Sequence, residues 1–295
     1  MTLNLPFKQI DVFTATPFKG NPVAVVNCMD VEESDVTTEQ LQSVANWTNL
    51  SETTFLFKPT LKECDYKLRI FTPANELPFA GHPTVGSCRA YLQFKNIKNA
   101  TAIKQECGVG IVDLSVEGDK ISFVAARADV EEVSDSLVES YKTAIGVPYV
   151  NRPSLMQTGP AWFVYLVDDA DTCLNLNLNL ANLKQVCDAA QHSGVILAGP
   201  RKSAEGIEYE MRALFTVPDT SFEDPVCGSG AVALLRYLQT IHNYDETVNV
   251  HITQGRRVHR NGHINGCIKV DPSNGAVSYH VGGSSVAVIN GEITL

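Results

Sequence analysis

Polar and hydrophobic residues alternate along much of the chain, and this period of two is typical of β-strands with one buried face. The pattern predicts strands at residues 7–13, 21–26, 53–57, 66–71, 101–105, 110–116, 120–125, 161–167, 195–198, 209–215, 248–253, 267–270 and 277–281. Helical spacing predicts helices at residues 37–46 and 180–190 and a third helix that ends at Ile145, before Gly146. Thr37 and Gln40 resemble a capping box at the start of the first helix.

Two further predicted helices, one from Thr84 and one from Gly228, carry apolar residues on nearly every face. A helix of this kind is buried. Each begins at a turn rich in glycine and proline: Gly81-His82-Pro83 precedes the first, and residues 224–230 surround the start of the second. The first backbone N–H groups of a helix have no acceptor within it, so both turns can bind an anion inside the protein.

The two turns belong to a repeat. Residues 82–92 resemble residues 224–234: His82, Pro83, Gly86 and Ser87 stand 142 positions before Asp224, Pro225, Gly228 and Ser229. Residues 55–59 and 69–72 have similar counterparts at 196–200 and 212–216. A repeat of about half the chain predicts an old duplication that produced two similar domains.

The order of elements predicts an α+β fold, in which each half forms a curved, mostly antiparallel sheet wrapped around its buried helix. We expect an N-terminal domain at residues 1–126 and a C-terminal domain at residues 127–283, with the strand at residues 284–295 returning to the first domain. The acidic residues 129–139 are expected to form an exposed crossover. Because ligand sites favour domain interfaces, we expect the active site in the cleft between the two domains.

The composition is that of an ordinary globular protein, with 44% hydrophobic and 19% charged residues. The formal net charge of −10 argues against nucleic acid or an acidic membrane as a partner. The one basic cluster, residues 256–260, runs into Asn261-Gly262 and is interpreted as a solvated hairpin rather than a phosphate site. No stretch of about 18 apolar residues could span a bilayer.

The eight cysteines show no CxxC pair and no histidine spacing typical of metal sites, so we expect no metal site. The N-terminal residues lack a charged segment followed by an apolar run, and we therefore expect no secretory signal. Cysteines in a chain without such a signal predict reduced thiols and a cytoplasmic protein.

Glu52 is a candidate for chemistry because it directly precedes the apolar strand predicted at residues 53–57. That strand carries it from a surface helix toward the core. Partial desolvation of a carboxyl group raises its pKa and suits it to proton transfer near neutral pH. Glu52 can equally be a capping or pairing residue at a strand start, and composition alone leaves both interpretations open.

The two turns supply the other polar candidates, and each has a structural alternative. His82 is either a site residue or a packed turn histidine, and Asp224 is either a site residue or a cap before the helix. Cys227 is either a nucleophile or a small buried hydrophobe, and Ser229 either binds substrate or only supports the helix start. Similar turns with different polar residues suggest that acid and base roles are divided between the halves.

Motifs along residues 11–230 together resemble the phenazine-biosynthesis PhzF-like family, and the chain length fits as well. They are Asp11-Val12-Phe13, Gly20-Asn21-Pro22-Val23-Ala24-Val25, Ser51-Glu52-Thr53-Thr54-Phe55, Arg69-Ile70-Phe71-Thr72-Pro73, Glu76-Leu77-Pro78-Phe79-Ala80-Gly81-His82-Pro83-Thr84 and Glu223-Asp224-Pro225-Val226-Cys227-Gly228-Ser229-Gly230. The resemblance implies the diaminopimelate-epimerase-like fold, with two pseudo-symmetric domains and the active site between them. It also implies a homodimer.

In the best-understood members of this family the reaction is an isomerisation of trans-2,3-dihydro-3-hydroxyanthranilate by proton transfer, without cofactor or metal. The resemblance implies that Glu52 is the general acid/base and that His82 and Asp224 hold the substrate and assist the transfer. It further implies that the carboxylate of the substrate is met by Gly81, Gly228 and Ser229. We therefore predict a cofactor-free isomerase of a small, cyclic carboxylate, whose identity no motif reveals.

Two other functions stay open. Proline racemases and diaminopimelate epimerases share the implied fold and use two facing cysteines. Cys227 and the residues after it resemble one cysteine turn, whereas Ala80 stands where the other thiol would be. The alternatives are an amino- or imino-acid epimerase that uses Cys227 alone, and a non-catalytic protein that binds small carboxylates. In the isomerase interpretation Cys227 belongs with the substrate-binding residues, and the intact set of Glu52, His82 and Asp224 favours an enzyme.

Overall fold

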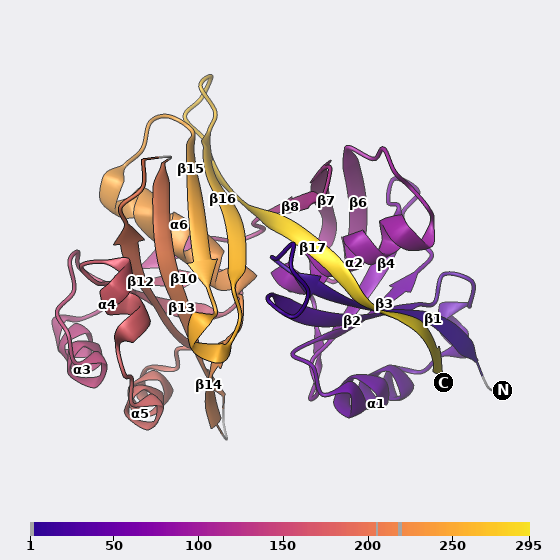
Figure 1. Cartoon of the computed structure of the whole chain (residues 1–295), viewed down its shortest axis with the longest axis horizontal. Coiled ribbons are helices and arrows are strands. Elements are labelled where there is room, and N and C mark those ends of the chain that lie inside the picture. The colour runs from indigo at the N-terminus through magenta and orange to yellow at the C-terminus, as the bar shows by residue number, and fades with distance from the viewer. Residues whose placement is uncertain (1–2, 205, 218–219) are drawn as a thin grey trace. The chain divides into compact units, whose positions relative to one another are not determined.

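The computed structural model describes residues 3–204, 206–217 and 220–295, and the chain forms two compact units (Figure 1). Unit 1 comprises the residues up to Val124 together with Gly282–Leu295, and unit 2 comprises Ala125–Val281. The boundaries expected from the sequence were 126/127 and 283/284. Each unit is described by itself below.

Unit 1 consists of strands and two α-helices. The strands are β1 (Asn4–Val12), β2 (Asn21–Asn27), β3 (Thr53–Phe57), β4 (Tyr66–Phe71), β5 (Glu76–Leu77), β6 (Ala102–Cys107), β7 (Gly110–Glu117), β8 (Lys120–Val124) and the end of β17 (Val277–Thr294) from Gly282 onward. The helices are α1 (Thr38–Thr48), α2 (Gly81–Phe94) and the short 3₁₀ helix η1 (Glu33–Asp35).

The strands of unit 1 pair in a closed circuit. From β1 the order is β2, β3, β4, β6, β7, β8 and β17, and β17 pairs with β1 again. The β2–β3 and β4–β6 pairs are parallel, whereas β5 adds a short antiparallel partner to β4. The sheet is therefore barrel-like, and a closed sheet leaves no free edges.

Helix α2 fills the inside of this sheet and packs on β1, β2, β3 and β8. Eleven of its residues are buried, as predicted for a helix that is apolar on nearly every face. Gly86 makes the close approach to β1 and β2 possible, because a Cβ there would lie 2.4 Å from Val23 Cγ1 and 2.9 Å from Val12 Cγ2. Helix α1 covers the other face of β3 and β4 through a separate apolar cluster around Leu41 and Phe55.

Unit 2 has the same kinds of element. The strands are β9 (Asp129–Glu131), β10 (Ser154–Gln157), β11 (Ala161–Leu166), β12 (Gly194–Arg201), β13 (Ile207–Val217), β14 (Thr220–Asp224), β15 (Val248–Gln254), β16 (Gly262–Val270) and the first part of β17, to Val281. The helices are α3 (Asp135–Ile145), α4 (Ala170–Asn175), α5 (Leu180–Ala190), α6 (Gly228–His242) and the 3₁₀ helix η2 (Arg256–Val258).

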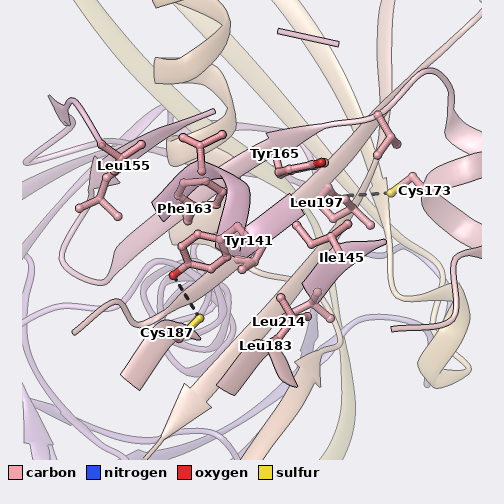
Figure 2. Close-up of a cluster of buried hydrophobic side chains, with 14 residues drawn as sticks. Tyr141, Ile145, Leu155, Phe163, Tyr165, Cys173, Leu183, Cys187, Leu197 and Leu214 are labelled. Atoms are coloured by element: carbon pink, nitrogen blue, oxygen red, sulfur yellow. Dashed lines mark hydrogen bonds between the residues drawn. The ribbon is translucent and has the colours of Figure 1, made fainter. Parts of the chain in front are cut away.

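The strand order in unit 2 is β9, β10, β11, β12, β13, β15, β16 and β17, and β14 forms a hairpin with β13. Helix α6 packs on one face of this sheet, against β10, β11, β12 and β16, and nine of its residues are buried. Helices α3, α4 and α5 contribute to the second apolar core (Figure 2). In it Tyr141 of α3 stacks on Phe163 with ring centroids 3.8 Å apart and donates a hydrogen bond to Cys187 Sγ of α5.

Many of the predicted elements are confirmed. The strands at residues 53–57 and 66–71 and the helix at residues 180–190 have the bounds expected from the sequence. The capping box is present, because Gln40 N–H donates to Thr37 Oγ1 and Thr37 N–H donates to Gln40 Oε1. The basic residues 256–260 lie between the antiparallel strands β15 and β16, as expected for a hairpin.

Other expectations were wrong. Helix α2 begins at Gly81 and not at Thr84, because a proline is tolerated in the first helical turn, where its missing N–H is not needed. The acidic stretch 129–139 is not a plain crossover, since it contains β9 and the start of α3 and buries Val133 and Val138. The strands β5, β10 and β14 and the helix α4 were not predicted. No helix in the described ranges is long and apolar enough to cross a membrane.

Gly86→Ala tests the packing of α2. We expect it to lower the free energy of unfolding by about 1–3 kcal/mol, because the new methyl group meets two stiff, fully buried valines. This outweighs the gain of up to about 1 kcal/mol that alanine has over glycine in a helix. Urea denaturation gives the value. The control is Gly291→Ala in β17, where a Cβ meets nothing within 4 Å; equal effects of the two substitutions would contradict the tight packing.

Candidate functional site

Unit 1 brings Glu52 and His82 together. Glu52 is the residue before β3, reached after α1 ends at Asn49 in a left-handed conformation, and His82 is the second residue of α2. Glu52 Oε2 lies 3.3 Å from His82 Nε2, and the two side chains are 16% and 7% exposed. The predicted partial burial of Glu52 is therefore present, and it has a histidine beside it.

The contact is not an ion pair, because His82 is neutral. Burial lowers the pKa of His82 to about 3, and a hydrogen bond to the backbone carbonyl of Pro22 only partly opposes this. A neutral imidazole has one N–H donor and one bare nitrogen. Since Nε2 faces Glu52, the nitrogen that donates to Pro22 is Nδ1, and Nε2 is the bare acceptor.

The Pro22 carbonyl is held in place by motif residues of the N-terminal strands. Pro22 pairs with Asp11 across β1 and β2. The Asp11 carboxylate accepts the N–H groups of Lys19 (2.9 Å) and Gly20 (3.1 Å), which fixes the loop that leads into β2. A Cβ on Gly20 would lie 2.1 Å from the Val12 carbonyl oxygen, so only glycine fits. These residues thus set which nitrogen of His82 carries the hydrogen.

This tautomer determines what the pair can do. A bare imidazole nitrogen and a carboxylate oxygen are both acceptors, and at 3.3 Å they attract each other only with a proton between them. Because a neutral His82 leaves Nε2 as an acceptor, a proton placed between the two atoms would be carried by Glu52. The pair can therefore hold one transferable proton away from bulk water, which is the chemistry expected of a general acid/base.

Unit 2 brings together the residues of the second turn. Asp224 is the last residue of β14 and is 8% exposed. Burial raises the pKa of its carboxyl group to about 7, although a hydrogen bond from the Val226 N–H acts in the opposite direction. Cys227, three residues on, is the N-cap of α6 and its Sγ accepts the Gly230 N–H at 3.3 Å. The turn thus combines a carboxyl that titrates near neutrality with a thiol that caps the helix.

Both buried helices present backbone donors at their first turn. In α2 the intrahelical bonds begin with Thr84 N–H to the Ala80 carbonyl, and in α6 with Ala231 N–H to the Cys227 carbonyl. The N–H groups of Gly81 and His82 in α2, and of Gly228 and Ser229 in α6, therefore have no acceptor within their own helix. Their dipole and direction suit an anion such as a carboxylate.

Trp162 was missed by the sequence analysis although it orients Ser229. It is fully buried in β11 and donates its indole N–H to Ser229 Oγ at 3.2 Å. Because the indole only donates, the serine hydroxyl accepts there and keeps its own hydrogen for another acceptor. Trp162 lies 67 positions before Ser229, and nothing in its local sequence distinguishes it from a core tryptophan.

Gln254 is the second residue that was missed. It is fully buried at the end of β15, and its side chain reaches Asp224 and Cys227. The only sequence signal was that Gln254 continues the alternating apolar positions Val248, Val250 and Ile252.

The structure thus groups Gly81 with Glu52 and His82 in unit 1, and it groups Asp224, Cys227, Gly228 and Ser229 in unit 2. One detail of the predicted repeat is wrong. The spacing of 142 matched His82 with Asp224, but His82 is the second residue of its helix and Asp224 lies four residues before α6. Counted from the helix starts, Ser229 occupies the place of His82. Among the described residues there is no group of three or more His, Cys, Asp or Glu side chains that could hold a metal ion.

Comparison with known proteins identifies relatives over nearly the whole chain. Residues 10–291 match the phenazine biosynthesis-like protein family, PhzC-PhzF. The chain is 36% identical to antisense-enhancing sequence 1 of Schizosaccharomyces pombe, over 97% of each chain. It is 31% identical to an uncharacterized isomerase of Pasteurella multocida, over 97% of this chain and 93% of the relative. With trans-2,3-dihydro-3-hydroxyanthranilate isomerase of Pseudomonas chlororaphis it shares 35% identity over 50% of this chain and 56% of that one.

Solved structures show the same mixed α+β fold. A phenazine biosynthesis protein of the PhzF family from Bacillus anthracis superposes with a TM-score of 0.83 at 21% identity, over 99% of both chains. A hydroxyproline epimerase from Agrobacterium vitis gives a TM-score of 0.63 at 12% identity, over 99% of this chain and 93% of that one. The fold is therefore shared with the epimerase class, as the resemblance implied.

Asp224→Asn tests the burial of that carboxyl group through stability. The pKa of Asp224 is about 7 in the folded protein, whereas its ordinary value, expected in the unfolded chain, is 3.8. Between these two pH values the folded state binds more protons than the unfolded state. The protein therefore loses stability as pH rises from about 4 to 7. Asparagine removes this penalty. We expect the variant to be more stable than wild type by roughly 2–4 kcal/mol at pH 8 and nearly equal to it below pH 4.

Urea denaturation at the two pH values provides the measurement. The control is Asp271→Asn, because Asp271 is an exposed turn residue whose pKa is lowered by hydrogen bonds from Ser273, and its replacement should give no gain at pH 8. A loss of stability in Asp224→Asn at pH 8 would show that the carboxylate is charged and well paired.

Proposed function

Because the chain belongs to the PhzC-PhzF phenazine biosynthesis-like family, we propose that it is an isomerase that transfers a proton between carbons of a small, cyclic carboxylate without a cofactor. Glu52 is the proton carrier. The observation that supports this assignment is the buried contact between Glu52 Oε2 and His82 Nε2, with the tautomer of His82 fixed by Pro22. Relatives named as isomerases support the reaction class.

In the proposed reaction one carboxyl group serves as both acid and base. Glu52 gives its proton to one carbon of an unsaturated substrate and takes a proton from another carbon, while the electron pair of the broken C–H bond forms the new double bond. The substrate gains and loses one proton, and Glu52 ends each turnover as it began.

The other residues bind and orient the substrate in this proposal. The N–H groups at the two helix starts, with the hydroxyl of Ser229, meet the substrate carboxylate, because a helix N-terminus favours negative charge. Asp224 supplies a second polar group that can donate or accept a proton near neutral pH, given a pKa of about 7. The sequence-based expectation that residues of both units act on one substrate is part of this proposal.

We also propose that the two units derive from a duplication, with four residues added in the second. The β3–β4 pair corresponds to β12–β13, and the parallel β4–β6 pair corresponds to β13–β15. An ion pair recurs in the following hairpin, Arg69 with Glu76 and Arg212 with Glu223, each at 2.8 Å. The hairpin between the members of the pair is longer in unit 2, and this accounts for the later helix start.

In this alignment the candidate site residues of the two units differ at every equivalent place. Glu52 corresponds to Gly194, whose missing Cβ leaves room for the Trp162 ring at 2.8 Å. Counting from the helix starts, Ala80 corresponds to Cys227, His82 to Ser229 and Leu77 to Asp224. A two-base epimerase needs equivalent groups on opposite faces of the substrate. One glutamate with no counterpart instead favours a single carrier.

The fold shared with a hydroxyproline epimerase keeps one alternative in view, an epimerase that uses Cys227. Its Sγ already serves as the acceptor for the first turn of α6, which favours a structural role. The other alternative is a protein that only binds small carboxylates. The proposed chemistry does not depend on the cytoplasmic location expected from the sequence. It also does not depend on the homodimer that the family resemblance implies.

Solvent-deuterium incorporation tests the proposal. In D₂O, with a panel of small carboxylates that includes dihydrohydroxyanthranilate, amino acids and hydroxyprolines, we expect Glu52→Gln to lose exchange by about 10²–10⁴-fold, the usual contribution of a general acid/base. The variant keeps the shape of the side chain and removes the exchangeable proton. Folding is checked by circular dichroism.

Cys227→Ser is the matched control, because serine retains an oxygen that can cap α6. Exchange should persist in this variant. Exchange that is lost in Cys227→Ser and kept in Glu52→Gln would move the protein to the epimerase class, and exchange with no compound in wild type would favour the binding protein.

A further inference from the structure

We infer that Gln254 is a positioning residue that holds the turn from Asp224 to Cys227 in the geometry that buries the Asp224 carboxyl group. The inference deepens the proposed function, on which its meaning for catalysis rests. Both hydrogen bonds of the Gln254 side chain go to backbone groups, so its role is to position the turn and not to act on the substrate. It acts through the backbone of the turn.

The side-chain amide of Gln254 spans the turn. Its Nε2 donates to the Asp224 carbonyl oxygen at 2.8 Å, and its Oε1 accepts the Cys227 N–H at 3.0 Å. These two backbone groups are the last of β14 and the N-cap of α6. One fully buried amide therefore joins the end of a strand to the beginning of the buried helix.

Two glycines next to Gln254, Gly255 and Gly262, allow the turn to pack closely against the strands. A Cβ on Gly255, which has φ of +96°, would lie 2.4 Å from the Pro225 carbonyl oxygen. A Cβ on Gly262, the partner of Gln254 across β15 and β16, would lie 2.3 Å from Val226 Cγ2. The turn thus lies directly on the ends of both strands.

Only glutamine satisfies these requirements. The site needs one donor and one acceptor at the end of a side chain long enough to reach from β15. Glutamate has the length but no donor for the Asp224 carbonyl, methionine has the volume but neither group, and asparagine is one methylene short. Loss of either bond would leave a buried backbone group unsatisfied, which costs about 1–3 kcal/mol.

Several charged groups of the surrounding elements are held in ion pairs. Arg212 of β13 binds Glu223 of β14 at 2.8 Å, and Arg201 of β12 binds Glu210 of β13 at 2.8 Å. Arg256 of η2 lies 3.9 Å from the same Glu210. Burial raises the pKa of Asp224 and the Val226 N–H lowers it, and both effects depend on the shape of the turn.

Gln254→Met is the direct test, because it keeps the volume and removes both hydrogen bonds. If the turn relaxes, Asp224 gains water, and its pKa should move from about 7 toward its ordinary value by on the order of one unit or more. The readout is ¹³C NMR of protein labelled at the aspartate carboxyl carbons, titrated from pH 4 to 9. The Asp224 signal is assigned by its absence in Asp224→Asn.

Gln105→Met in unit 1 is the matched control. Gln105 is also fully buried; its Oε1 accepts the Tyr66 hydroxyl hydrogen and its Nε2 donates to Thr84 Oγ1, each at 3.1 Å. We expect a comparable loss of stability from this variant and no shift of the Asp224 titration. Gln254→Asn is the second variant, and it should shift the titration in the same direction if methionine prevents folding.

An unchanged Asp224 titration in folded Gln254→Met or Gln254→Asn would overturn the inference, as would an equal shift in Gln105→Met. Because the NMR titration needs no substrate, its result is independent of whether Glu52→Gln abolishes deuterium exchange. Where deuterium exchange is measured against pH, the part of the pH dependence that disappears in Asp224→Asn is due to Asp224. This part should shift to lower pH in Gln254→Met, whether Asp224 acts as acid or as base.

Discussion

The buried contact between His82 and Glu52 governs the chemistry of unit 1. Desolvation keeps the imidazole neutral, and the Pro22 carbonyl takes its only N–H donor. The nitrogen that remains can only accept, so a proton shared by the two side chains would be carried by the glutamate. Asp11 and Gly20 stand far from Glu52 in sequence. They hold the loop that leads into β2 and thereby fix the Pro22 carbonyl, which determines which group of the pair can act as an acid.

Unit 2 places its carboxyl group differently. Burial itself brings the pKa of Asp224 close to neutral pH. Such burial lowers stability above the ordinary pKa of an aspartate, and proteins retain costs of this kind mainly where function needs them. The protonation of the two carboxyl groups is thus controlled in two ways. In unit 1 the control is the fixed tautomer of His82, and in unit 2 it is a tightly packed turn.

Local sequence signals predicted the elements that depend on local interactions. The capping box at Thr37 and the strands at residues 53–57 and 66–71 follow from side-chain pattern alone. Strand β14 was missed because Glu223 and Asp224 look like turn residues, whereas the strand is held by Arg212, a residue of the neighbouring strand. The start of α2 was placed too late because Pro83 appeared to precede the helix and is in fact part of its first turn.

The candidate site was predictable where a local pattern marks its residues. Glu52 was a candidate because it precedes an apolar strand, and His82 and Asp224 because they lie in the two turns; the family motifs then implied their roles. Trp162 and Gln254 act across 67 and 27 positions in sequence on Ser229 and Cys227, and no periodicity connects residues so far apart. The tautomer of His82 was equally hidden, since it depends on the backbone carbonyl of Pro22.

The most direct measurement is the protonation state of Glu52 in the resting protein at neutral pH. Infrared spectra of protein with ¹³C-labelled glutamate carboxyl groups, taken for wild type and Glu52→Gln, isolate the contribution of this one side chain. A fixed His82 tautomer predicts the C=O band of a protonated carboxylic acid, present in wild type and absent in the variant. A difference spectrum with carboxylate bands only, together with an imidazolium signal from His82 in ¹⁵N NMR, would contradict it.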